Sequence, residues 1–206
     1  MKQKVRKVSR LLSRTDKAID RFREKSKLVC KSNCGSCCYT NKVESTVLEF
    51  LPLAEFLWQN KTADAVLEQL AQTEENDHCI FYIPEPAEPS LGRCSIYEHR
   101  GLLCRLFGFA IRINKRGEPE LLACKLIKES DNNQLDIFKI VNSKYPKPIM
   151  GLYYMQLADI DYALTKTMLP VNKAIQEAIL LYGFNALFDC QKDDLSPPKN
   201  KRKKAN

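Results

Sequence analysis

The chain has 206 residues, of which 44% are hydrophobic and 28% are charged, and its formal net charge is +8. No uncharged apolar run approaches the roughly 18 residues that a membrane-spanning helix needs, so we expect a soluble globular protein without a membrane partner. Residues 1–28 hold eleven Lys and Arg against three Asp and Glu, and residues 195–206 hold five basic residues and no acidic one. The N-terminus lacks an apolar segment of signal-peptide length, which predicts a cytoplasmic protein.

Residues 1–29 predict a basic amphipathic helix. Apolar and small residues recur there at spacings of three and four, namely Val5, Val8, Leu12, Thr15, Ile19 and Phe22. That period places them on one face of a helix. We interpret the segment as a helix packed on the rest of the protein, with its basic face in solvent.

The middle of the chain predicts short helices followed by strands. Thr46 and Glu49 have the spacing of a capping box, which starts a helix running toward Gln59 with Pro52 as a kink or a restart. Thr62 begins a second helix. Residues 78–82 then predict a short strand, and residues 106–114 and 120–124 predict a hairpin.

The last third of the chain predicts three helices, over residues 136–143, 152–168 and 171–187, the last favoured by Pro170 before its start. Residues 191–206 predict a disordered basic tail. The expected fold class is α+β: a small cysteine-cluster domain with short strands, flanked by N-terminal and C-terminal helices. We expect the metal-binding part to span 30–128 and its helical continuation 129–190.

The cysteines are the most informative residues. Four crowd into nine residues and four more follow, giving the set Cys30, Cys34, Cys37, Cys38, Cys79, Cys94, Cys104 and Cys124. Cysteine that serves only as a small core residue has no reason to cluster, so the pattern indicates disulfides, metal ligation or a reactive thiol. Disulfides fit poorly because nine cysteines are an odd number and because adjacent residues such as Cys37 and Cys38 are awkward to bridge.

Metal ligation explains the pattern best. The gaps of three residues after Cys30 and of two after Cys34 are typical of zinc and iron–sulfur ligand loops. Gly35 lies between the pairs, where such a loop often needs a positive φ. Eight thiols are two tetrahedral sets, so we expect two centres, or one centre with a second layer of thiols. Cys190 is interpreted as an ordinary buried residue.

Other side chains near the cysteines have predicted supporting roles. Arg105 directly follows Cys104, and its guanidinium would offset thiolate charge and donate hydrogen bonds to sulfur. Tyr97 would hydrogen-bond a sulfur or pack in the core. His78 and His99 lie beside candidate cysteines, so either is an alternative zinc ligand.

The segments CGSCC and CSIYEHRGLLCRLF resemble the YkgJ-like cysteine-cluster family, also called the CxxCxxCC or zinc- or iron-chelating domain family. The second segment matches the family pattern at Cys94, Ile96, Tyr97, Arg100, Cys104, Arg105 and Phe107. The resemblance covers residues 30 to about 125 and implies a zinc or iron–sulfur site. Flagellin lysine methylases carry a similar cluster.

Three functions remain open from the sequence. The first is a metal-binding protein that holds zinc or an iron–sulfur cluster in a structural or carrier role. The second is a modifying or redox enzyme supported by the cluster, as in the methylase branch. The third is a module that binds RNA, a ribosomal surface or another polyanion through its basic ends, with metal stabilising the fold.

Overall fold

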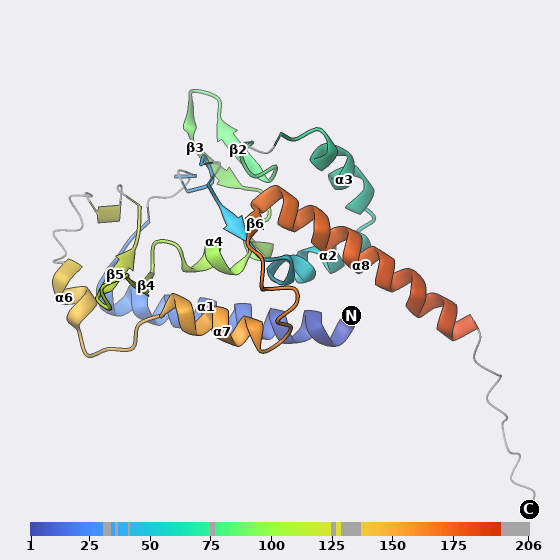
Figure 1. Cartoon of the computed structure of the whole chain (residues 1–206). Coiled ribbons are helices and arrows are strands. Elements are labelled where there is room, and N and C mark those ends of the chain that lie inside the picture. The colour runs from blue at the N-terminus through green and yellow to red at the C-terminus, as the bar shows by residue number, and fades with distance from the viewer. Residues whose placement is uncertain are drawn as a thin grey trace, which may run out of the picture.

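The protein has helices at both ends of the chain and small antiparallel strand pairs between them (Figure 1), which confirms the predicted α+β class. In the computed structural model the described residues are 1–30, 34–35, 37–40, 42–74, 77–124, 127–128 and 137–194. Of residues 89–90 and 188–194 only the backbone is described. None of the helices in these ranges combines the length and the apolar composition that a membrane-spanning helix needs.

The helices differ widely in length. They are α1 (Lys2–Ser26), α2 (Leu51–Gln59), α3 (Ala63–Ala71), α4 (Leu102–Leu106), α6 (Ile137–Asn142), α7 (Met150–Ala158) and α8 (Val171–Asp194), with 3-10 turns η1 (Val47–Phe50) and η2 (Tyr97–His99). The strands form three antiparallel pairs, namely β1 (Glu44–Ser45) with β6 (Leu169–Pro170), β2 (Tyr82–Glu85) with β3 (Glu88–Cys94), and β4 (Ala110–Ile113) with β5 (Pro119–Leu122).

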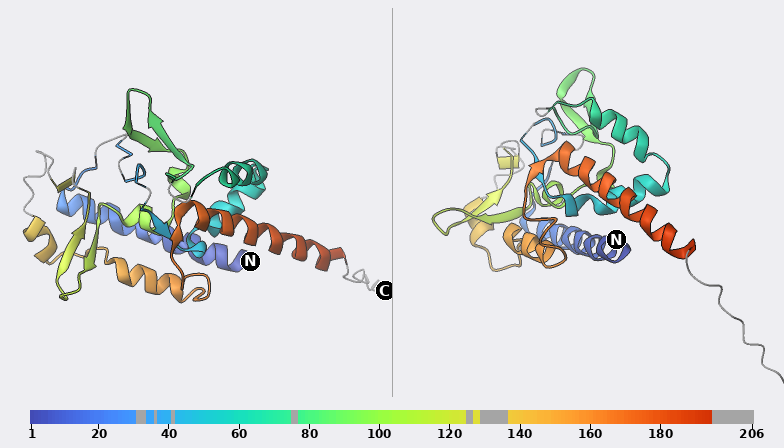
Figure 2. Two further views of the ribbon diagram at one scale, coloured as in Figure 1. Left: turned by 45° about the horizontal axis from the view of Figure 1, so that its top comes forward. Right: turned by 45° about the vertical axis from the view of Figure 1, so that its right-hand side comes forward.

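The predicted apolar stripe of α1 is confirmed, because Val5, Val8 and Phe22 are almost fully buried and the stripe also includes Leu11. This face packs on α2 and α4, while α7 runs alongside (Figures 1 and 2). The helix ends at Ser26 and is capped by Lys27, which adopts a left-handed conformation with φ of 58° and donates its N–H to the Arg23 carbonyl. One face of α1 is therefore buried in the core, and the opposite face points outward.

Two apolar clusters form the interior. The larger joins α1, η1, α2, α3, α4 and α8. Its α2–α8 contact includes the Trp58 indole, which donates a 3.0 Å hydrogen bond to the Ile179 carbonyl. The smaller cluster joins the C-terminal end of α1 to the β4–β5 hairpin and α6 through Phe22, Ile111 and Leu121. Cys79 packs against the larger cluster and Cys124 against the smaller one.

The predicted capping box is confirmed, although it starts a 3-10 turn rather than the α-helix itself. Glu49 accepts the backbone N–H of Thr46 at 3.0 Å, and the reciprocal cap interaction is also present. Pro52 lies in the first turn of α2, where its missing N–H costs nothing. The predicted helix after Thr62 is α3.

Several predicted boundaries are wrong. Residues 78–79 have no regular structure and 80–81 form a turn, so the strand begins only at Tyr82, where it pairs with β3, a strand that the sequence patterns did not predict. Residues 102–106 are helical, so the hairpin strand begins at Ala110. The helix predicted over 152–168 ends at Ala158, and α8 continues to Asp194. Apolar spacing identifies an element but marks its ends poorly, because turn contacts and pairing partners decide them.

The disorder predicted for residues 191–206 is wrong for 191–194, which belong to α8. For 195–206 that prediction falls outside the described residues, as does the burial of the Cys190 side chain. The division of the chain at residues 29, 128 and 190 stays a prediction.

Candidate metal centre

The eight predicted ligands come from separate segments of the chain. Cys30 follows α1, and Cys34, Cys37 and Cys38 lie in and around the turn that follows. The other four lie in the turn before β2, at the end of β3, on α4 and after β5, and they are Cys79, Cys94, Cys104 and Cys124 respectively. All eight are thiols, and Cys30 and Cys37 are the exposed members.

The cysteine turn is held tightly against the β2–β3 hairpin. Cys34 forms a parallel bridge with Gly92 of β3, and the turn closes when Cys38 donates its N–H to the Gly35 carbonyl at 2.7 Å. Gly35 has the expected positive φ, 34°, and a Cβ atom there would lie 2.5 Å from the Tyr82 ring. Only glycine therefore permits this approach.

The hairpin positions two further thiols. The Tyr82 N–H donates to the Cys79 carbonyl at 2.8 Å, and Tyr82 pairs across the hairpin with Cys94. Ser95 fixes the same end by donating its hydroxyl to the Phe81 carbonyl. Burial raises the pKa of Cys79 to about 11, and burial also raises the pKa of Cys94.

Cys104 is presented by α4, whose first turn is anchored by Glu49. This fully buried carboxylate accepts the N–H groups of Leu102 at 2.7 Å and Leu103 at 3.2 Å, in addition to its contacts with Thr46. Burial raises the pKa of Cys104, and the charges of Cys79 and Glu49 add to the effect. The sequence indicated Glu49 only as a cap of its own turn and gave no sign that it also holds α4.

The thiols form two neighbourhoods that meet at Cys37. Burial, followed by the charges of Cys34, Cys37 and Cys124, raises the pKa of Cys30 to about 11. The side chains of Cys37 and Cys38 hydrogen-bond each other, which raises the pKa of Cys38 and lowers that of Cys37 to about 7. Cys38 is in turn influenced by Cys94 and Cys104. Every predicted ligand therefore lies within electrostatic range of at least one other.

Two cations act on the thiols: Arg23, whose charge lowers the pKa of Cys30 against the larger effect of burial, and Arg100. The charge of Arg100 lowers the pKa of both Cys37 and Cys94, against the larger effects of hydrogen bonding and burial. Its guanidinium lies 3.8 Å from the centre of the Tyr97 ring. The buried Nε–H has no hydrogen-bond acceptor among the described residues. The sequence patterns assigned no role to Arg100, although the residue belongs to the motif that carried the family resemblance.

The hydrogen-bond partners of Arg105 differ from the cysteine sulfurs that were predicted. Its buried guanidinium donates to the carbonyl oxygens of Arg100 at 3.0 Å and Glu98 at 2.5 Å, and it pairs with the carboxylate of Asp16 on α1. These partners are oxygens rather than sulfur. Arg105 therefore ties the loop after Cys94 to α1. Tyr97 is 56% exposed, so the alternative that placed it in the core is wrong.

The two histidines have aromatic partners. His78 packs on Tyr39 with ring centres 4.6 Å apart, and His99 stacks on Phe56 at 4.0 Å. Within the described ranges, no three or more His, Cys, Asp and Glu side chains are already arranged to hold a metal ion. The thiols are thus gathered in one region without forming a finished coordination shell.

Comparison with protein families identifies this region. The model of the CxxCxxCC family, described as a putative zinc- or iron-chelating domain, matches residues 29–136, just over half of the chain. The chain belongs to the CxxCxxCC family. The matched range begins one residue before Cys30 and contains all eight predicted ligands, but it excludes α1, α6, α7 and α8. No curated protein and no solved structure is significantly similar to the chain.

The residues of this CxxCxxCC domain fit a metal that is bound through sulfur ligands. Thiolates are the preferred donors for both zinc and iron–sulfur clusters. A thiolate-rich centre carries excess negative charge, and the buried Arg100 Nε–H, beside Cys37 and Cys94, is a donor that lacks an acceptor among the described residues. A thiolate there would satisfy this donor.

Proposed function

We propose that the eight cysteines bind zinc or an iron–sulfur cluster in a structural or carrier role. The observation that carries the proposal is that segments up to 94 residues apart in sequence, from Cys30 to Cys124, bring thiols into two electrostatic neighbourhoods that meet at Cys37. Clustering of this kind has no advantage for packing alone. When bound, zinc would cross-link these segments, whereas an iron–sulfur cluster would also allow one-electron transfer.

The thiols divide naturally into two sets of four. The outer set is Cys30, Cys34, Cys37 and Cys124, and the inner set is Cys38, Cys79, Cys94 and Cys104. Cys30 is influenced by the other three outer thiols, and Cys104 is influenced by Cys79 and Cys94 but also by Cys37, so the division is supported for every thiol except Cys37. Cys37 also contacts Cys38, so it lies at the boundary between the sets. We infer two centres, each held by one set.

Three protein groups would act on these centres. The Gly35 turn and the β2–β3 hairpin hold the outer and inner thiols at close approach. Glu49 fixes the helix that carries Cys104. Arg100 offsets the charge of four thiolates, which exceed the charge of one divalent zinc ion by about two.

The test is the metal content of anaerobically purified protein, with an absorption spectrum to distinguish zinc from iron–sulfur. The wild type should carry metal for two four-thiolate sites. Cys30→Ser and Cys79→Ser should each lose about half of it, because each removes a ligand from one set only. Cys190→Ser is the matched control and should retain the full metal content. Full metal content in Cys104→Ser would refute the inner set.

A further inference from the structure

The exposed side of α1 carries a continuous row of cations. Lys7, Arg10, Arg14, Lys17 and Arg21, here called the basic row, follow one another at spacings of three and four, and all five are exposed. Residues with this spacing share one helix face. At 1.5 Å per residue the basic row is about 21 Å long. This is an extended charged surface rather than a point site.

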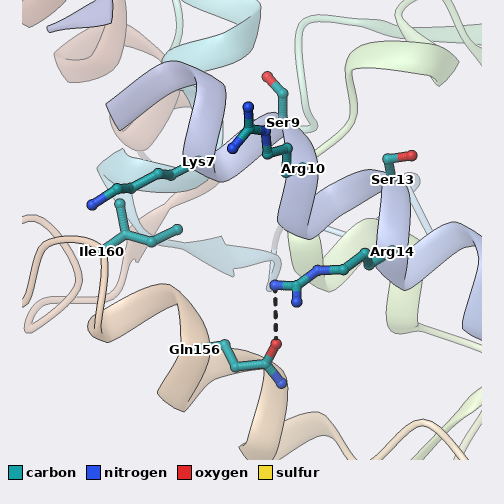
Figure 3. A pocket seen from close by; sticks show the side chains of 7 residues that line it. All are labelled: Lys7, Ser9, Arg10, Ser13, Arg14, Gln156 and Ile160. Carbon is teal, nitrogen blue, oxygen red and sulfur yellow. Dashed lines mark hydrogen bonds between the residues drawn. The ribbon is translucent and has the colours of Figure 1, made fainter. Parts of the chain in front are cut away.

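The first half of the basic row lines an open groove between α1 and α7, with a volume of about 650 Å³ (Figure 3). The Arg14 guanidinium extends across it to the Gln156 side-chain oxygen at 3.3 Å. Ser9 and Ser13 of α1 also line the groove. Guanidinium, ammonium, hydroxyl and amide groups are the side chains that donate to phosphate oxygens.

An aromatic residue lies beside the second half of the basic row. Tyr153 of α7 is partly buried. Burial raises its pKa, and the charges of Arg21 and Arg14 act in the opposite direction, which indicates that both cations are near the phenol. Because Tyr153 also packs in part against the larger apolar cluster, it offers at most one stacking contact to a base beside these cations.

The charge of the basic row is not cancelled by the nearest acids. Asp161 pairs with Lys4 at 2.5 Å, and Asp16 pairs with Arg105. Asp20 lies 3.8 Å from Arg23. In the part of the chain that the structure describes, no carboxylate forms an ion pair with a member of the basic row. Its positive potential is therefore available to a partner.

We propose that the basic row and its groove bind a nucleic acid through the phosphate backbone. Three of the five cations are arginines, whose planar guanidinium can donate two hydrogen bonds to one phosphate. A membrane surface fits less well, because a helix that binds lipid inserts an exposed apolar face, and the apolar face of α1 is buried in the core. The row lies outside the residues matched to the metal-chelating family, so the proposal is independent of metal binding.

The experiment measures binding of a short fluorescein-labelled single-stranded RNA to the full chain by anisotropy, over a range of salt concentrations. The test variant is R10E/R14E, and the control is K115E/R116E. The control has the same change in charge, placed on the exposed turn between β4 and β5. Melting temperature and metal content are measured for each protein, so that misfolding is recognised separately.

The wild type should bind with log affinity falling linearly with log salt. R10E/R14E should weaken binding at low salt by at least about tenfold, and removing two phosphate contacts should reduce the salt slope by about 1.4. K115E/R116E should keep the wild-type slope. Equal losses in both variants, or an unchanged slope in R10E/R14E, would overturn the proposal. It would also be overturned if the wild type bound phosphatidylserine vesicles or polyglutamate but not the RNA.

Discussion

At the scale of single residues, Glu49 links the capping turn before α2 to the helix that carries Cys104. Its two oxygens receive the N–H and hydroxyl of Thr46 and the N–H groups of Leu102 and Leu103. Burial raises the pKa of Glu49, while these donors act in the opposite direction. A carboxylate can accept all four hydrogen bonds because it has no donor of its own.

Glu49→Gln should therefore destabilise the protein by about 1–3 kcal/mol, because the amide nitrogen cannot accept and leaves a buried N–H unpaired. Urea denaturation measures the change. Glu68→Gln, which removes the same charge from an exposed position on α3, should change stability by less than about 0.5 kcal/mol. Equal stability of the two variants would show that Glu49 does not anchor α4.

At the scale of elements, the contact of α2 with α8 depends on a glycine inside a helix. A Cβ atom at Gly183 would lie 2.5 Å from the Trp58 ring, whose indole N–H is already fixed on the Ile179 carbonyl. On α7, by contrast, a Cβ atom at Gly151 would meet no other described atom within 4 Å. The same substitution therefore has opposite consequences in the two helices.

Gly183→Ala should lower stability by about 1–3 kcal/mol through overpacking, even though alanine is the better helix former. Gly151→Ala should raise it by about 0.5 kcal/mol, because alanine reduces the entropy of the unfolded chain without a clash. Thermal unfolding of the two variants measures whether each substitution raises or lowers stability. A stabilised Gly183→Ala would mean that α8 can shift away from Trp58 at little cost.

At the scale of the whole molecule, the apolar core and the thiol region are held by different forces. The larger apolar cluster joins α1, α2 and α8 without requiring a metal, whereas Cys34 and Cys94 belong to neither apolar cluster. Metal binding and folding are coupled where ligands come from separate segments. Metal should therefore stabilise one part of the protein far more than the other.

Removing metal with a chelator should abolish hydrogen-exchange protection in residues 34–40 and 77–95 while leaving α2, α4 and α8 protected, because local opening follows local contact density. Mass spectrometry of exchanged peptides reports each region. Wild-type protection in the cysteine segments after chelation would contradict a metal-supported fold. Simultaneous loss in α8 would instead indicate a single cooperative unit.

The sequence by itself determined what depends on residues a few positions apart. The buried face of α1, the Thr46–Glu49 capping box and the positive φ at Gly35 follow from local spacing and local sterics, and the clustered cysteines indicated the family. Only the tertiary structure decided which distant groups meet. In the folded protein the cysteine turn pairs with β3, and Glu49 accepts hydrogen bonds from the first turn of α4. Arg100 lies near the thiols, whereas Arg105 donates to backbone and carboxylate oxygens. These contacts join segments tens of residues apart, and no periodicity or spacing encodes them, because they form only when the whole chain packs.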